Sequence, residues 1–517
     1  MIFHSILSPG VSARTANEPD AANEREGQPG FFGDLNLDQI IAGITAGKDD
    51  YDLIPFFHVP LHDLDSIEYR HEIMRDLENA GVIGAVRRFA ERLHTMRQHR
   101  ARCEKLHYQR QKERWFLDAV GTYCDAVTGL VEDLSGAALT ARGLVAFRDH
   151  LTGYAGSEPF IALRAQTKKL MAGLASVHYC VLINGARVQV SKFGDERDYS
   201  LDVEATFTRF KQGSVKDYDF SFRDSPEMNH IEANILDLVA KIYPDVFSEL
   251  TAYCTANLSY ENATVTVFDR EIQFYVSCLE YIDRFRKVGL NFCYPRIVQE
   301  CKEVFSDRGF DLALAGTLLG EHATPVCNDF YLSGQERIIV VSGPNQGGKT
   351  TFTRTFGQLH YLAVLGCLVP GTRAQLFLFD DLLTHFEREE NMNNLRGKLQ
   401  DDLIRIRQIL DRATPHSIVI MNEIFTSTTL RDAVALSKSI AAKIMALDLL
   451  CVWVTFIDEL ASLSAQTVSM VSTVRPDNPA LRTYEIVRRP ADGLSYALSI
   501  AEKYRLTFAM IKERTGP

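Results

Sequence analysis

The stretch RIIVVSGPNQGGKTTFTRTFGQLHYLAVLGCLVP, residues 337–370, decides the fold of this chain. It opens with the β-branched apolar run Ile338–Val341, passes through a glycine-rich turn and continues with the apolar spacing of a helix. We therefore predict a buried strand, a loop and a long helix, in that order. Within the stretch, residues 343–350 fit the pattern G-x-x-x-x-G-K-[ST] of a phosphate-binding loop.

The residue types of this loop suit phosphate chemistry. Glycines let consecutive backbone N–H groups turn towards a phosphate, and the following helix adds the positive end of its dipole. We expect Lys349 to reach the β- and γ-phosphates of ATP, and the Thr350 hydroxyl to bind Mg²⁺. The alternative, a strand-to-helix turn with a surface lysine, leaves three glycines and the Lys-Thr pair unexplained. The expected nucleotide-binding residues are Gly343, Pro344, Asn345, Gln346, Gly347, Gly348, Lys349, Thr350 and Thr351.

A second apolar run, SIVIM at residues 417–421, is followed by Asn422 and Glu423. In phosphate-loop ATPases this strand usually ends in Asp-Glu, where the aspartate helps to hold Mg²⁺ and the glutamate polarises the attacking water. Because asparagine carries no charge, we expect weak Mg²⁺ binding at Asn422 and slow hydrolysis, with Glu423 as the general base. The alternative for Glu423 is an acidic helix cap. A third apolar run, residues 449–455, completes a pattern of buried parallel strands separated by helices.

Composition places the chain among globular proteins. Its 517 residues are enough for two to four domains, and 46% of them are hydrophobic and 24% charged. The ten cysteines contain no C-x-x-C pair, which favours reduced thiols over disulfides or a zinc site. No run approaches 18 apolar residues, and the N-terminus lacks the pattern of a signal peptide, so we expect a cytoplasmic protein without membrane contact.

The basic residues gather in one segment of this acidic chain. The net charge of −11 argues against the whole surface binding nucleic acid, but residues 87–115 hold ten Lys/Arg against three Glu. Such a segment is able to follow a phosphate backbone. The alternatives are a solvated helical arm or a partner for acidic surface elsewhere. The candidate DNA contacts are Arg97, Arg100, Arg102, Arg110 and Arg114.

We expect three segments along the chain. Residues 1–34 are predicted to be a flexible tail, because Asn17–Gly30 is polar and rich in Pro, Gly and Asn. Residues 35–298 show mainly helical periodicity, with a β-hairpin near 178–192, where β-rich runs flank Asn184-Gly185. Residues 299–517 show the alternating strands and helices of an α/β P-loop NTPase domain.

Together these motifs resemble the MutS family of DNA mismatch-repair ATPases. GPNQGGKTT at residues 343–351 is similar to the family's GPNMGGKST, whose third-place Asn is absent from general phosphate loops. Residues 409–424 resemble the stretch that leads to S-L-V-L-M-D-E-I, and TFIDEL at 455–460 is similar to T-H-Y-x-E-L. Weaker similarities reach the family's closing S-Y-G-L-x-V-A segment, at residues 482–514, and both ends of its helical core, at 59–77 and 270–285. The resemblance covers roughly residues 36–515.

This resemblance implies a MutS-like ATPase domain of the ABC/MutS type at the C-terminus, preceded by a mainly α-helical core/lever domain. It implies a homodimer joined through the ATPase domain, with ATP and Mg²⁺ as cofactors and DNA as partner. In that picture the arginines of residues 97–114 lie on a lever helix, and the short segment 195–230 forms a reduced clamp.

The sequence also departs from the family pattern. We expect neither the N-terminal domain with a Phe-x-Glu wedge nor a C-terminal endonuclease domain; Phe247-Ser248-Glu249 lies inside a late helix of the core. The family's switch-region His is Phe456, and its G-R-G-T-S-T-Y-D-G appears as residues 425–433. Thr428 and Thr429 retain hydroxyls where the family's signature acts across the dimer on the other subunit's nucleotide.

The leading hypothesis is an ATP-dependent DNA-binding protein of the MutS mismatch-repair type, which couples ATP binding and slow hydrolysis to DNA clamping without a mismatch-reading domain. The alternative is an ATP-binding scaffold that holds a protein partner with little or no hydrolysis. A transporter-type phosphate-loop ATPase fits less well, because the chain lacks an LSGGQ-type signature.

Overall fold

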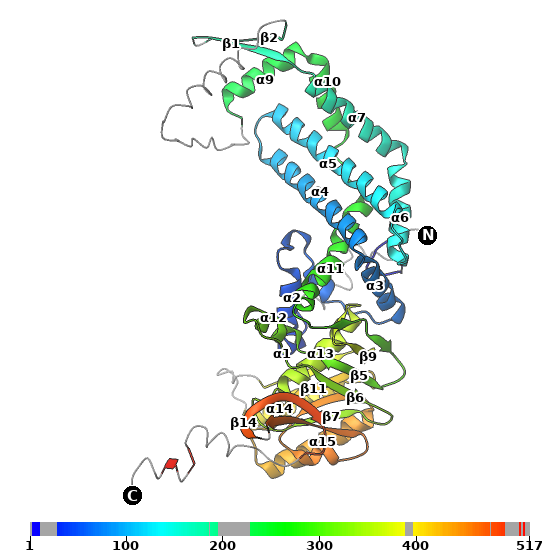
Figure 1. Ribbon diagram of the computed structural model, residues 1–517, viewed down its shortest axis with the longest axis vertical. Coiled ribbons are helices and arrows are strands. Elements are labelled where there is room, and N and C mark those ends of the chain that lie inside the picture. The colour runs from blue at the N-terminus through cyan, green and yellow to red at the C-terminus, as the bar shows by residue number, and fades with distance from the viewer. Residues whose placement is uncertain are drawn as a thin grey trace. The chain divides into compact units, whose positions relative to one another are not determined.

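The structure is a computed structural model that describes residues 3–10, 28–185, 187–194, 228–387, 397–475, 477–491, 506–507 and 510–511. It divides into two compact units, a smaller unit 1 and a larger unit 2 (Figure 1). Unit 1 comprises residues 1–3, 80–139 and 145–269. Unit 2 comprises residues 4–79, 140–144 and 270–517.

Unit 1 is helical, as its apolar spacing predicts. Helices α4 (Ala80–Lys105) and α5 (Gln109–Ser135) pack along each other. The buried residues of α4 are spaced three or four positions apart, from Val82 through Val86 and Phe89 to Leu93, so one face of the helix enters the core. The other described helices with residues in this unit are α6 (Arg142–Ala155), α7 (Glu158–Ala175), α9 (His230–Ile242), α10 (Pro244–Ala256) and α11 (Ala263–Arg286), of which α6 and α11 contribute to both units.

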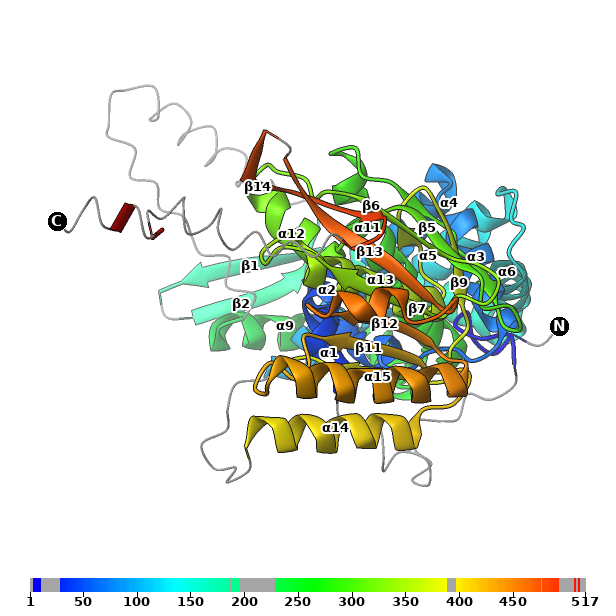
Figure 2. The same ribbon diagram turned by 90° about the horizontal axis from the view of Figure 1, so that it is seen from below.

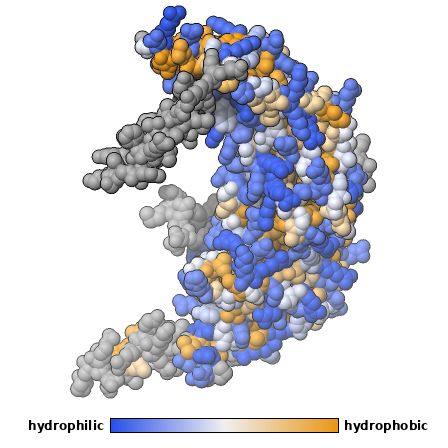
Figure 3. Space-filling model, turned by 45° about the horizontal axis from the view of Figure 1, so that its top comes forward, coloured by the Kyte–Doolittle hydropathy of each residue, from blue (hydrophilic) through white to orange (hydrophobic). Residues whose placement is uncertain are grey.

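The predicted hairpin is present in unit 1. Strands β1 (Tyr179–Asn184) and β2 (Arg187–Lys192) pair antiparallel, and Gly185 takes the positive φ of 59° that a tight turn requires. Apolar side chains are exposed on it, with Leu182 at 64% and Ile183 at 70%, and hydrophobic surface gathers at this end of the unit (Figure 3). The predicted reduced clamp at 195–230 lies outside the described residues except for its last three positions.

Unit 2 is built on a six-stranded sheet in the order β10-β11-β12-β7-β13-β14. Neighbouring strands are parallel except for the last pair, β13 and β14, which is antiparallel. The central strands are buried and nearly free of polar residues, as expected for a sheet covered on both faces. The strands are β7 (Ile338–Ser342), β10 (Leu382–His385), β11 (Ile418–Asn422), β12 (Leu450–Val454), β13 (Thr467–Arg475) and β14 (Asn478–Arg488).

Helices cover this sheet on both faces. On one face, α14 (Lys398–Arg412) and α15 (Leu430–Leu447) lie side by side, and their apolar residues join a core cluster with Met421 and Trp453 (Figure 2). On the other face, α13 (Lys349–Val364) packs against β11 and β12. This is the α/β arrangement that the sequence predicts, with α13 directly after β7.

Smaller elements complete unit 2. A four-stranded sheet has the order β4-β9-β5-β6, and β3 pairs with β8 in a two-stranded one. These strands are β3 (Phe292–Cys293), β4 (Arg296–Val298), β5 (Val304–Gly309), β6 (Asn328–Leu332), β8 (Val369–Pro370) and β9 (Arg373–Phe377). The remaining described helices are α1 (Phe31–Leu35), α2 (Leu37–Thr45), α3 (Leu64–Leu77) and α12 (Leu312–Gly320), with 3₁₀ turns at Asp49–Tyr51, Ile54–Phe57 and Asp458–Ser462.

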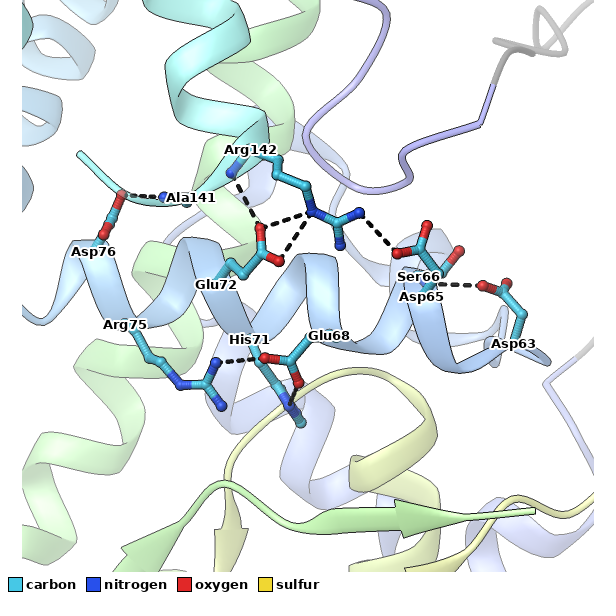
Figure 4. A network of polar contacts seen from close by, with 10 residues as sticks. All are labelled: Asp63, Asp65, Ser66, Glu68, His71, Glu72, Arg75, Asp76, Ala141 and Arg142. Atoms are coloured by element: carbon cyan, nitrogen blue, oxygen red, sulfur yellow. Dashed lines mark hydrogen bonds and ion pairs between the residues drawn. The ribbon is translucent and has the colours of Figure 1, made fainter. Parts of the chain in front are cut away.

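Helix α3 holds the short segment 140–144 by polar contacts (Figure 4). Asp63 caps the helix by accepting a hydrogen bond from the Ser66 N–H, at 2.7 Å. At the other end, Asp76 accepts from the backbone N–H groups of Thr140 and Ala141, both at 2.8 Å. Between them, Arg142 pairs with two carboxylates of the helix, Asp65 and Glu72.

The predicted tail of residues 1–34 is wrong in its limits. Phe3, Ile6 and Leu7 are buried, and the backbone of this segment accepts hydrogen bonds from Tyr69 and Arg70. Helix α1 also begins before the predicted start, since its apolar residues Phe32 and Leu35 enter the core of unit 2. Residues 11–27, where the composition is most polar, lie outside the described part of the chain.

The predicted boundary at residue 298 also differs from the division of the structure, which groups residues 4–79 and 270–298 with residues 299–517. Buried hydrogen bonds explain this grouping. The Arg70 guanidinium donates to the Leu365 carbonyl at 2.7 Å, and the Tyr361 hydroxyl donates to the Phe57 carbonyl at 2.7 Å. Helical periodicity cannot show which neighbour a helix packs against.

All ten cysteines are free thiols, as their spacing predicts. Among the helices that the structure describes, none has both the length and the apolar character needed to cross a membrane.

Candidate functional site

The phosphate-binding loop lies between β7 and α13, where the sequence predicts it. Strand β7 ends at Ser342 and α13 begins at Lys349, with Gly348 as its N-cap. The backbone takes positive φ angles at Gly343 (113°) and Gly348 (88°), which glycine adopts without strain. The loop therefore needs these glycines for its shape.

Lys349 is buried against the loop that precedes it. Its ammonium donates to the carbonyls of Gly343 (3.0 Å) and Pro344 (3.2 Å) and to the side-chain oxygen of Asn345 (3.1 Å). The Glu423 carboxylate lies 3.6 Å from it. Burial lowers the pKa of Lys349, while the charge of Glu423 acts in the opposite direction.

The two predicted Mg²⁺ ligands are brought together. The Thr350 hydroxyl on the first turn of α13 donates to the side-chain oxygen of Asn422 at the end of β11, at 3.2 Å. Glu423 follows at once with a positive φ of 51°, and its side chain, one-third exposed, lines the same cavity as the loop. The carboxyl end of β11 thus presents an amide and a carboxylate side by side.

A cavity of 710 Å³ opens beside the loop, within the size range of small-molecule sites. Seven of the nine predicted nucleotide-binding residues, from Asn345 to Thr351, line it together with Glu423. Gly343 and Pro344 do not line it; they accept hydrogen bonds from Lys349.

Sequence reasoning missed the other wall of this cavity. It comes from α12, the segment after it, β6 and β14, and consists of Leu314, Leu318, Thr324, Pro325, Val326, Asn328 and Tyr484. These residues belong to segments far apart in the chain and follow no motif. The one signal available was their membership of the nucleotide-binding segment 299–517.

The predicted trans-signature residues lie at the start of α15. Thr429 is the N-cap of this helix, and its hydroxyl donates to the Asp432 carboxylate at 2.8 Å. Thr428 precedes it and is half-buried. Neither residue lines the cavity. Leu430 (63% exposed) and Phe456 (52% exposed) add apolar surface to unit 2.

The five candidate DNA-contact arginines all belong to α4 and α5 of unit 1, and each has a partner within that unit. Four of them pair with carboxylates, namely Arg97 with Asp269, Arg100 with Glu261, Arg110 with Glu113 and Arg114 with Asp118. The fifth, Arg102, stacks over the ring of Trp115 at 4.9 Å. Their contact with DNA stays a prediction.

Comparison with known proteins agrees with the loop geometry. The family model described as MutS domain V matches residues 339–515, which include the phosphate-binding loop, Asn422 and Glu423. This part of the chain is a MutS domain V. This confirms the resemblance that the motifs indicate.

Curated relatives of the MutS family match parts of the chain. The DNA mismatch repair protein MutS of Shouchella clausii is 25% identical over 291 residues, which cover 54% of this chain and 32% of that protein. The Endonuclease MutS2 of Thermus thermophilus is 31% identical over 193 residues, 36% of this chain and 25% of that protein. The DNA mismatch repair protein Msh3 of Mus musculus is 28% identical over 162 residues, 31% and 15% respectively. The chain thus covers at most about a third of the length of these relatives.

Proposed function

We propose that this chain binds ATP with Mg²⁺, hydrolyses it slowly and couples its nucleotide state to DNA binding. The observation that carries the proposal is the cavity in unit 2, where Lys349, Thr350 and Glu423 meet along the phosphate-binding loop. Each of these side chains suits one task in phosphoryl chemistry, and the cavity is large enough for a small-molecule ligand.

The two walls of the cavity fit the two ends of a nucleotide. The loop offers backbone N–H groups and the Lys349 ammonium for the phosphates. The rest of the lining is more apolar, with Leu314, Leu318 and Val326, and it includes the half-exposed Tyr484. This wall suits the flat base of a nucleotide.

Mg²⁺ fits the oxygens that Thr350 and Asn422 present. The hydroxyl and the amide oxygen already lie within hydrogen-bonding distance of each other, and oxygen ligands are those that Mg²⁺ prefers. When bound, the ion would neutralise charge on the phosphates. Asn422 contributes no charge of its own, which supports weak metal binding and slow turnover.

Glu423 is the proposed general base. Its carboxylate lines the cavity and lies 3.6 Å from the Lys349 ammonium. A phosphate that takes over the ammonium would leave the carboxylate available to a water molecule. The slow rate follows because the neighbouring Asn422 supplies no second negative charge to hold the metal.

DNA binding and dimer formation are the less direct part of the proposal. Their support is the match of residues 339–515 to MutS domain V, and the similarity to two relatives that are named as DNA mismatch repair proteins. Arg102 and Arg114 have exposed side chains on unit 1, and their positive charges suit contact with a phosphate backbone. For the homodimer we propose contact through the ATPase domain, with Thr428 and Thr429 acting on the other subunit's nucleotide.

One observation favours a second candidate, the ATP-binding scaffold for a protein partner. Each of the five candidate arginines has an intramolecular partner in unit 1. Binding to DNA would have to compete with these contacts. In this alternative, ATP binding without appreciable hydrolysis would control the hold on the partner.

Steady-state ATP turnover with and without duplex, mismatched and branched DNA separates the two candidates. DNA binding is measured as well, at about 50 and about 200 mM salt, between which six to ten phosphate contacts lose about 10³–10⁵ in affinity. We expect slow turnover that DNA alters and binding that weakens steeply with salt. ATP binding without turnover or DNA binding would favour the scaffold.

A further inference from the structure

A serine from the strand beside β7 reaches the phosphate-binding loop. Ser472 lies on β13, about 120 residues after the loop, and is 1% exposed. Its hydroxyl donates to the carbonyl of Gly347 at 2.7 Å. No sequence motif links these two positions, and nothing in the chemistry described above uses Ser472.

The position of Ser472 is fixed from two sides. The parallel pairing of β13 with β7 ends at Val471 opposite Ser342, so Ser472 is the next residue and stands beside the start of the loop. On its other side, Ser472 is paired with Ile486 of β14. A side chain anchored by two strands in this way is a rigid support for the loop.

The loop packs directly on this support at two of its glycines. A Cβ atom at Gly343 would lie 2.9 Å from the Ser472 carbonyl oxygen and 3.1 Å from its Cβ. A Cβ atom at Gly347 would overlap the Ser472 hydroxyl. Both glycines are therefore needed for close approach to Ser472, and Gly343 is also needed for its positive φ angle.

The hydrogen bond fixes the direction of one peptide group. In a trans peptide, the carbonyl of Gly347 and the N–H of Gly348 point in opposite directions. Because Ser472 holds the carbonyl on the β13 side of the loop, the N–H of Gly348 is turned away from β13. Gly348 lines the cavity, which makes its N–H available to a bound ligand.

We propose that Ser472 is a positioning residue for nucleotide binding, which aims the N–H of Gly348 at the phosphates by holding the Gly347 carbonyl. This inference rests on the proposed function, since it takes the cavity to be a nucleotide site. It assigns to β13 a role in phosphate recognition that the motif alone does not contain. Without the hydroxyl, the peptide between Gly347 and Gly348 is free to rotate, and a preorganised donor is lost.

The test compares Ser472→Ala with Ser469→Ala in the full chain. Ser469 is a matched control, because it lies on the same strand and its buried hydroxyl has no hydrogen-bond partner among the residues described. Affinities for ADP and for adenosine are measured by competition against a fluorescent ADP analogue. We expect Ser472→Ala to weaken ADP binding about tenfold, the worth of about one hydrogen bond. Adenosine binding should be unchanged, and Ser469→Ala should bind ADP like the wild type.

The outcomes are distinguishable. Unchanged ADP affinity in Ser472→Ala, or an equal loss for ADP and adenosine, overturns the positioning role. A wild-type chain that binds no ADP overturns the proposed function, and this inference falls with it. If Ser472→Ala does not fold, Ser472→Thr and Ser472→Val provide a pair of equal shape that differs in the hydroxyl. Tighter ADP binding by the threonine variant, by about tenfold, then supports the proposal, and equal binding overturns it.

Discussion

In the proposed site, Asn422 stands where phosphate-loop ATPases usually have an aspartate. Its amide oxygen accepts from Thr350, and an aspartate there would keep that hydrogen bond while adding a charge. We expect Asn422→Asp to strengthen Mg²⁺ binding and to raise ATP turnover about tenfold, whereas Asn422→Ala should lower both. Mg²⁺ titrations of steady-state turnover check the pair.

Glu423 gives the complementary test. Replacing a general base lowers the rate of the catalysed step about 10²- to 10⁴-fold. Glu423→Gln should therefore reduce ATP turnover by about a hundredfold or more while ATP stays bound. If Asn422→Asp lowers turnover and Glu423→Gln leaves it intact, the roles assigned to both residues are wrong.

His360 makes the stability of unit 2 sensitive to acid. It is fully buried on α13, and this burial lowers its pKa to about 4 from the ordinary value of 6.5. Between these values the unfolded chain binds a proton that the folded chain does not, so the free energy of unfolding falls as pH falls. The contribution is on the order of 3 kcal/mol over this window.

We expect His360→Leu to lose the contribution of His360 to the pH dependence of stability, because leucine has no proton to bind. Urea unfolding of the wild type and the variant at pH 7 and pH 4.5 measures it. His71 on α3, whose pKa burial also lowers to about 4, contributes equally to both proteins and so leaves their difference unaffected. An identical loss of stability in the two proteins on acidification would contradict the assignment to His360.

At the scale of elements, we expect two of the candidate arginines, Arg97 and Arg114, to differ in how much they stabilise unit 1. Arg97 on α4 pairs with Asp269 on α11, whereas Arg114 pairs within its own helix. The Asp269 side chain is 3% exposed beside Arg97, so Arg97→Ala leaves a buried carboxylate without that guanidinium and should cost about 3–5 kcal/mol of stability. Arg114 pairs with Asp118 one helical turn away on a more exposed surface, and Arg114→Ala should cost at most about 0.5 kcal/mol. Chemical denaturation compares them.

The double variant Arg97→Ala with Asp269→Asn is the control, since it removes the buried charge as well. It should recover part of the lost stability. Equal costs for Arg97→Ala and Arg114→Ala would show that the buried ion pair is not what holds these helices. The result also guides DNA experiments, because a variant that destabilises unit 1 cannot report on phosphate contact.

How far the elements were predictable depends on whether their signal is local. The order of β7, loop and α13, the strands β11 and β12, and the hairpin at Asn184-Gly185 all follow from apolar runs and glycines that are adjacent in sequence. The part of the cavity lining that lies outside the loop, the support from Ser472 and the packing of residues 4–79 in unit 2 depend on contacts across the chain. Periodicity gives no information about such partners.

At the scale of the whole molecule, the net charge of −11 means that any DNA binding must come from a local basic face. Each phosphate contact contributes about one unit to the slope of log affinity against log salt. We therefore expect Arg102→Ala with Arg114→Ala to weaken binding to all duplexes about equally and to flatten this slope by about two units. Fluorescence anisotropy at several salt concentrations measures both. An unchanged slope would place DNA contact elsewhere or favour the scaffold.

The loop between β7 and α13 is proposed to bind the phosphates of ATP. Calorimetric titration of ATP with Mg²⁺ into the full chain tests it most directly, in the wild type and in Lys349→Ala, with Lys438→Ala on the surface of unit 2 as control. We predict one ATP per chain for the wild type and the control. Lys349→Ala should bind ATP more weakly, with a Kd raised about tenfold to a hundredfold, because it removes the buried ammonium that would face the phosphates. An equal Kd for Lys349→Ala and the wild type, or no binding by the wild type, would contradict the account.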